Sequence, residues 1–181
     1  KYGVELLVCS SLNRNSGTMV REKTKMEKML ISGVAADKNV AKIRVAGLGN
    51  DPESTFRLLN LLDRNNLNID VMIQSLGKDG TKSVSFTVAK PDMLRTIDVL
   101  NDNKDSLGIK KLDYDENVAK ISVIGAGVRS HSGVAAKMFG ALANAGINTE
   151  MITTSEIRIT ALIDEAYADQ AMRAIHETFL E

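Results

Sequence analysis

One segment of the sequence occurs twice, and this internal repeat constrains the fold more than any other feature. Residues 39–49 (NVAKIRVAGLG) match residues 117–127 (NVAKISVIGAG) at most positions. A second, shorter match follows in the same order, between residues 67–70 and residues 147–150. Since chance does not explain both matches, the chain contains two copies of one structural unit.

Each copy begins with a strand and a helix. Residues 43–45 and 121–123 alternate apolar with polar side chains, which is typical of a half-buried strand. Asp51 and Pro52 then suit the start of a helix, and Gly146 suits the end of the equivalent helix in the second copy. The sequence therefore predicts a strand followed by a helix in both copies.

A hairpin and a second helix complete each unit. Residues 69–74 and 84–88 alternate on either side of a turn at 78–80, which predicts two paired strands. Apolar residues at helical spacing follow at 93–100 in the first copy and at 168–179 in the second. The order βαββα lacks only a fourth strand to become a ferredoxin-like βαββαβ sandwich.

The missing fourth strand predicts how the copies are connected. Residues 109–114 can supply it in the first copy, but the second copy ends with its helix. The only unassigned apolar run nearby is 29–36, so we predict that residues 30–36 pair with the second copy. The prediction is an α+β fold of two ferredoxin-like βαββαβ units, the first (39–115) inserted into the second (29–38 and 116–181), packed as one rigid body.

Residues 1–28 belong to neither copy and are predicted to be the tail of another domain plus a linker. Lys1, and not methionine, opens the sequence, which fits a piece of a longer protein. The single cysteine, Cys9, favours a reducing compartment, and the cytoplasm is the default prediction.

Composition argues against nucleic acid and membrane partners. Lysine and arginine number 23, aspartate and glutamate also number 23, and 4% of residues are aromatic. An RNA-binding module of the same strand order needs aromatic residues on its central strands, where this chain offers Phe86. The longest apolar stretch, 121–128, is far shorter than the roughly 20 residues that a membrane helix needs.

The usual catalytic and metal-binding patterns are missing. His131, His176 and Cys9 do not make a metal site of the zinc-finger kind, so we expect no metal. The glycines at 47–49 and 125–127 lack the third glycine and the parallel crossover of a dinucleotide site. The loops 49–55 and 127–133 remain candidate sites, because a helix N-terminus offers NH groups to a carboxylate. Helix capping by Asp51 and Ser132 is the alternative explanation.

The repeat unit resembles the ACT domain, and particular strings resemble the paired ACT domains at the C-terminus of aspartate kinase (aspartokinase). The strings are SGVA at 32–35, GAGVRSHSGV at 125–134 and NTEMITTSEIRI at 148–159. The resemblance covers residues 29–181, and residues 4–18 look like the closing strand and turn of that family's kinase domain. In that family one ACT unit is also inserted into the other.

The resemblance implies a regulatory role with no catalysis in this chain alone. The kinase domain, which would bind ATP and magnesium and phosphorylate aspartate, lies outside the chain apart from its tail, so no cofactor is expected here. The implied effector is lysine, threonine or both, for feedback control of amino-acid biosynthesis, and a homodimer through ACT contacts is expected. The alternative is a regulatory subunit of another amino-acid enzyme, such as acetolactate synthase or homoserine dehydrogenase.

The candidate effector site joins one copy's loop to the other copy's strand, as the resemblance favours. Glu53 departs from the family, which often has glycine there, and this weakens carboxylate binding by the first loop. The candidates of the first copy are Asn50, Asp51, Pro52, Glu53, Thr55 and Gln74. Those of the second copy are Val128, Arg129, Ser130, His131, Ser132, Asn148 and Thr149. Gln74 and Asn148 are predicted to serve the same ligand.

Overall fold

The structure is a computed structural model that describes residues 6–8, 18–20, 31–130 and 133–180. Near the N-terminus, β1 (Leu6–Val8) pairs antiparallel with β2 (Thr18–Val20). The assignment of residues 1–28 to a preceding domain stays a prediction, and Cys9 and the turn that links β1 to β2 lie outside the described residues.

The first unit follows the predicted order of elements. Its first strand is the C-terminal half of β3 (Gly33–Leu48), and Asp51 and Pro52 start α1 (Pro52–Arg64) as predicted. The other elements are β4 (Met72–Leu76), β5 (Lys82–Ala89), η2 (Lys90–Asp92), α2 (Met93–Asp102), α3 (Lys104–Leu107) and the start of β6 (Lys111–Ile124).

The second unit repeats the order. The second half of β6 leads into α4 (Gly127–Ser130) and α5 (Val134–Asn144). Helix α5 ends just before Gly146, as predicted, and Gly146 has a left-handed backbone conformation. The remaining elements are β7 (Met151–Thr154), β8 (Arg158–Asp164), η3 (Glu165–Tyr167) and α6 (Ala168–Leu180).

Two predicted strand boundaries were wrong. Regular pairing of β4 begins at Met72 and not at Ile69, because the backbone N–H groups of the preceding residues are bonded to Thr87. The Oγ1 of Thr87 accepts from Val71 N at 3.1 Å, and its carbonyl oxygen accepts from Asp70 N at 3.1 Å. Ile109 lies outside β6, since its N–H closes the end of α3 by donating to Lys104 O at 2.9 Å.

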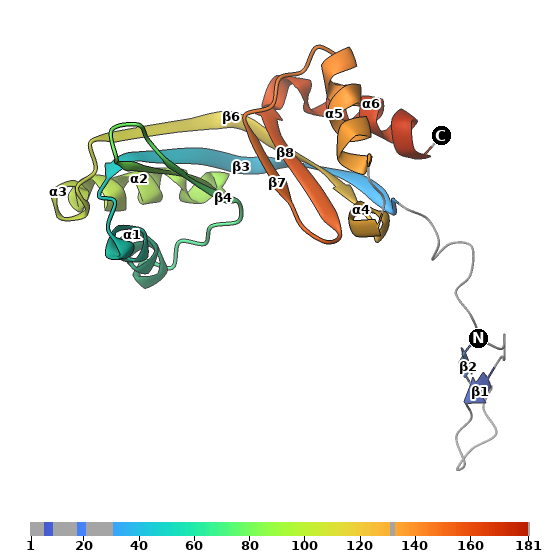
Figure 1. Cartoon of the computed structure of the whole chain (residues 1–181), viewed down its shortest axis with the longest axis horizontal. Coiled ribbons are helices and arrows are strands. Elements are labelled where there is room, and N and C mark those ends of the chain that lie inside the picture. Colours follow the sequence, from blue (N-terminus) through green and yellow to red (C-terminus); the bar gives the residue numbers. More distant parts are fainter. Residues whose placement is uncertain (1–5, 9–17, 21–30, 131–132, 181) are drawn as a thin grey trace.

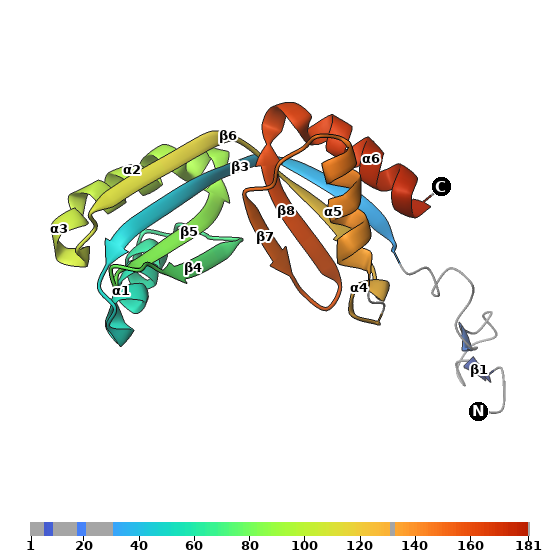
Figure 2. The ribbon, with the colours of Figure 1, turned by 45° about the horizontal axis from the view of Figure 1, so that its top comes forward.

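The strands of the two units form one antiparallel sheet in the order β4-β5-β3-β6-β8-β7. The long strands β3 and β6 run through both units, with Val40 opposite Val118 at the centre (Figures 1 and 2). Residues 33–37 pair with residues 120–124 of the second copy. This confirms that the second unit takes its fourth strand from before the first, and hence that the first unit is inserted.

Each unit has its own core beneath its helices. Helices α1 and α2 pack on the face of the sheet that carries Ile43 and Val45, and α5 and α6 pack on the face that carries Ile121 and Val123. The two four-stranded halves share β3 and β6, so each has the strand order of a ferredoxin-like sandwich.

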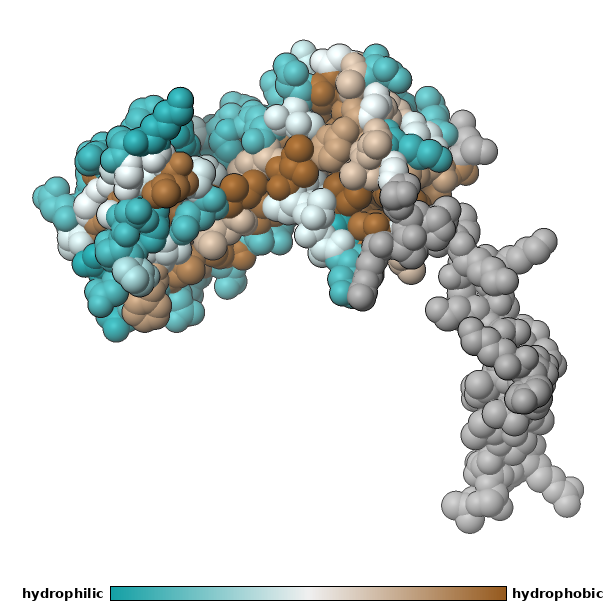
Figure 3. All heavy atoms as spheres, in the orientation of Figure 1, coloured by the Kyte–Doolittle hydropathy of each residue, from teal (hydrophilic) through white to brown (hydrophobic). Residues whose placement is uncertain are grey.

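A third, smaller cluster joins the units on the opposite face of the sheet. It consists of buried side chains from both copies, packed against two half-buried ones from the first: Val40, Val118, Met151 and Leu162, with Val71 and Ile73. Figure 3 shows hydrophobic residues gathered where the two units meet, whereas the outer end of the first unit is mostly hydrophilic.

Candidate effector-binding loops and the open face of the sheet

The first candidate loop is organised around Asp51. Its Oδ1 accepts from the backbone N–H groups of Glu53 (2.9 Å) and Ser54 (2.8 Å), and its Oδ2 accepts from the Ser54 hydroxyl. The hydrogen bond from the Ser54 hydroxyl, together with those from the backbone, holds the pKa of Asp51 below its ordinary value against the opposing effect of burial. The first-turn NH groups of Glu53 and Ser54 are therefore already occupied by a capping carboxylate.

Two of the predicted site residues meet beside this cap. The Thr55 hydroxyl donates to Gln74 Oε1 at 2.6 Å, which joins α1 to the edge strand β4. Asn50, Pro52 and Glu53 are exposed on the same loop. The first loop and Gln74 thus lie together, at one edge of the sheet.

Two cations near this loop were missed by the sequence analysis. Lys82 Nζ donates to the carbonyl oxygen of Asp51 at 2.7 Å, and Arg57 Nη2 lies 3.6 Å from Asp51 Oδ1. Lys82 lies at the start of β5 and Arg57 in the second turn of α1, and in the sequence a single charged residue at such a position is read as an ordinary solvated residue. They bring two positive charges to this loop, both of them in contact with Asp51.

The second candidate loop contains a short helix. Val128, Arg129 and Ser130 belong to α4, and Val128 packs against the core of the second unit. His131 and Ser132 lie outside the described residues. The N-cap residue of α5 is Gly133, which has no side chain to cap the helix, and capping by Ser132 stays a prediction.

Asn148 and Thr149 lie at a different place from Gln74. They line a surface hollow of about 360 Å³ together with residues of the second unit, namely Phe139, Leu142, Ala143, Gly146 and Ile147. Gln74 is not among the residues of this hollow, and β4 and β7 are opposite edges of the sheet. That one ligand reaches both Gln74 and Asn148 remains a prediction.

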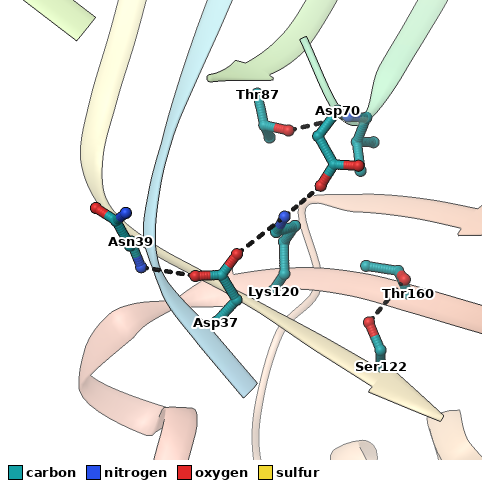
Figure 4. A network of polar contacts seen from close by, with 8 residues as sticks. Asp37, Asn39, Asp70, Thr87, Lys120, Ser122 and Thr160 are labelled. Carbon is teal, nitrogen blue, oxygen red and sulfur yellow. Dashed lines mark hydrogen bonds and ion pairs between the residues drawn. The ribbon is translucent and has the colours of Figure 1, made fainter. Parts of the chain in front are cut away.

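The face of the sheet opposite the helices holds a polar network around Lys120 (Figure 4). Lys120 Nζ lies 3.0 Å from Asp37 Oδ2 and also contacts the carboxylate of Asp70. Nearby, the hydroxyls of Ser122 and Thr160 are buried and hydrogen-bond to each other at 2.8 Å. These side chains border a cavity of about 360 Å³ that is also lined by the end of β7 and by Arg158.

The charges of this network stabilise one another. Burial acts to raise the pKa of Asp37, but the hydrogen bond from Lys120, that from Asn39 N and the Lys120 charge together hold it below its ordinary value. Burial acts to lower the pKa of Lys120, but the hydrogen bonds and charges of Asp70 and Asp37 raise it above its ordinary value. Asp37 and Lys120 are therefore both ionised at neutral pH.

We expect Lys120→Gln to destabilise the fold more at pH 7 than at pH 3. Because the pKa of Asp37 lies below 3.8, the stability that this carboxylate contributes is present above that pH and is lost as the pH falls through the lowered pKa. The contribution of Lys120 is fully present below pH 10.5, so it adds no pH dependence in this range. Urea unfolding of the unchanged protein and of Lys120→Gln at pH 7 and pH 3 measures the effect, with a change at exposed Lys137, Lys137→Gln, as the control. An equal loss of unfolding free energy at the two pH values would contradict the prediction.

No metal site and no membrane helix is found in the part of the chain that the structure describes. Among residues 6–8, 18–20, 31–130 and 133–180, no group of three His, Cys, Asp or Glu side chains is placed to hold an ion. No helix within those ranges is both long and apolar enough to cross a bilayer. His176 is exposed on α6.

Comparison with known proteins agrees with this architecture. A family model of the ACT domain matches residues 121–179. Aspartokinase of Pseudomonas aeruginosa is 37% identical over 99% of this chain, which spans 44% of that relative's length. The regulatory subunit of aspartate kinase from Thermus thermophilus is 33% identical with a TM-score of 0.78, over 83% of this chain and 99% of that one. E. coli aspartokinase III in complex with lysine and aspartate shares the fold at 22% identity, with a TM-score of 0.70 over 99% of this chain and 40% of that one.

The fold and these matches define a regulatory region built from two ACT domains. The chain belongs to the aspartokinase family, and it corresponds to the family's allosteric regulatory region. It spans less than half the length of the curated relatives that it matches.

Proposed function

We propose that this region binds a free amino acid, lysine or threonine or both, and thereby controls the activity of an aspartate kinase by feedback. The observation that carries the proposal is the contact between Thr55 and Gln74, which places hydrogen-bonding groups of α1 and β4 beside Lys82 and Arg57. Such a site can offer cations to the effector's carboxylate and side-chain oxygens to its ammonium. The lysine-bound E. coli neighbour supports the choice of effector.

The catalytic partner would be a kinase domain outside this chain. That domain would bind ATP and magnesium and transfer the γ-phosphate of ATP to the side chain of aspartate, while this region holds no cofactor of its own. We place the protein in the cytoplasm, since its sequence contains a single cysteine.

Gln74→Ala and Asn148→Ala are each expected to weaken effector binding by about tenfold, the result of losing roughly 1.4 kcal/mol of hydrogen bonding. Asn101→Ala, an exposed amide on α2, is the matched control and should leave the affinity unchanged. Calorimetric titration with lysine and with threonine measures the effect. Affinities within about twofold of the unchanged protein for both variants would show that the site is misplaced.

We also propose a homodimer that forms through the ACT units. The strands β4 and β7 are the two edges of the sheet, and exposed edges favour pairing with another chain. Large apolar side chains are exposed there and on α1: Leu76 (62%), Ile152 (45%) and Phe56 (65%). A second copy of the chain would cover both the edge and these side chains.

Light scattering is expected to give a mass of about twice 19.6 kDa at micromolar concentrations. Leu76→Glu, which puts a charge on the β4 edge, should shift the mass toward that of the monomer, whereas the same change at exposed Leu94 on α2 should not. A mass of 19.6 kDa for the unchanged protein at every concentration would argue against the dimer.

A further inference from the structure

The two units are related by an internal twofold repeat that places equivalent charges in equivalent positions. Val40 faces Val118 where β3 and β6 cross the middle of the sheet. The sequence repeat makes Lys42 the counterpart of Lys120, each in the first strand of its own unit. It likewise makes Asp70 the counterpart of Glu150, each at the end of the segment that follows the unit's first helix.

Both lysines reach across to the other unit. Lys120 of the second unit contacts Asp70 of the first, and Lys42 of the first unit contacts Glu150 of the second. The Lys120 side chain is 15% exposed and the Lys42 side chain 24% exposed, so both ammonium groups are partly shielded from water, whereas the side chains of Asp70 (58%) and Glu150 (34%) are more exposed. The two ion pairs are equivalent under the repeat: in each, the lysine of one unit contacts the acidic residue of the other unit. This crossed arrangement therefore follows from the repeat itself.

The acidic partners lie in the segments that carry the candidate effector residues. Glu150 follows directly after Asn148 and Thr149, and Asp70 lies in the stretch that leads into β4 and Gln74. The next residues, Val71 and Met151, are also equivalent and pack together in the cluster that joins the units. Each segment is thus held on the open face by one lysine of the opposite unit and by that shared cluster.

We propose that Lys42 and Lys120 are positioning residues, each of which fixes the effector-binding segment of the opposite unit. The inference rests on the proposed function for its effect on binding, but the crossed placement of the contacts stands without it. A segment held in its bound conformation pays less conformational entropy when the ligand arrives. Loss of one lysine therefore loosens the other unit's segment and leaves its own segment in place.

Amide hydrogen exchange tests the crossed arrangement without any effector. Lys42→Met should raise exchange in residues 148–152 and leave residues 69–73 unchanged, whereas Lys120→Met should do the reverse. Lys38→Met is the matched control, because Lys38 also lies in β3 and forms an ion pair, with Asp169 at 2.9 Å, but is 43% exposed and lies away from both segments. Glu150→Gln and Asp70→Asn remove the negative charge of the same ion pairs from the acidic side if a lysine variant folds poorly.

Titration with lysine and threonine then tests the effect on binding. Lys42→Met should weaken effector affinity by at least about fivefold, and Lys42→Glu combined with Glu150→Lys should recover most of what Lys42→Glu alone loses. Two results would overturn the proposal. One is amide hydrogen exchange that rises in the lysine's own unit, or equally in both units; the other is a Lys42→Glu/Glu150→Lys double variant that binds no better than Lys42→Glu alone. If the unchanged protein binds neither amino acid, the proposed function fails, but the exchange result still decides whether the contacts are crossed.

Discussion

Replacing Ile121 with alanine is expected to lower the free energy of unfolding by about 3 kcal/mol, the usual cost of removing a large buried aliphatic side chain. Ile121 is fully buried in the second unit's core, and it lies on β6, which also forms part of the first unit's sheet. Since β3 and β6 run through both units, the two units should unfold together. We therefore expect the variant to unfold in one cooperative transition, at a lower denaturant concentration than the unchanged protein. Circular dichroism and a spectroscopic probe in each unit measure this transition.

Leu94→Ala is the control for this experiment, because Leu94 is 68% exposed on α2 and its truncation should change stability by less than about 0.5 kcal/mol. Two separate transitions, of which the Ile121 variant moves only one, would show that the units are independent domains. That result would contradict the single sheet as the structural link between them.

Gly47→Ala is expected to destabilise the fold by about 2–3 kcal/mol. Gly47 has φ +88°, and a Cβ there would lie 2.5 Å from both Cβ and Cγ of Lys110. Those atoms lie close to the backbone, whose Lys110 N–H donates to Ala46 O at 2.9 Å, so the side chain has little room to move away. The change therefore adds a steric clash to an unfavourable backbone conformation, just ahead of the first candidate loop.

Gly108→Ala separates these two costs. Gly108 has φ +70° but nothing within 4 Å of its added Cβ, so it should lose only about 1 kcal/mol for the left-handed conformation. Thermal or urea unfolding of the two variants compares them directly. Equal losses at both positions would mean that the contact with Lys110 relaxes at no cost.

The arrangement of the chain was predictable because the sequence repeats itself. The match between residues 39–49 and 117–127 showed two units, and the fourth strand that the second unit needs was assigned to residues 30–36, of which residues 33–36 pair there. The merging of the two sheets was not predicted. It depends on register shifts between Asp37 and Val40 and between Val40 and Lys42, which let β3 continue from one core to the other. Such irregularities leave no clear pattern in the residues.

The candidate site was predictable only in part. The Asp51 cap follows from local rules and is present. The cross-unit contacts of Lys42 and Lys120 were missed, because a lysine in an alternating strand is read as an ordinary solvated residue. The signal was nevertheless in the sequence, since both lysines and both acidic partners occupy equivalent positions of the repeat.

Calorimetric titration of the unchanged chain with lysine and with threonine, with alanine as the comparison, tests the central claim most directly. The account predicts saturable binding of lysine, threonine or both, and no saturable binding of alanine, because the site should recognise the effector's side chain as well as its backbone charges. Absence of saturable heat for both lysine and threonine, or equal binding of alanine, would contradict an amino-acid sensor of this specificity.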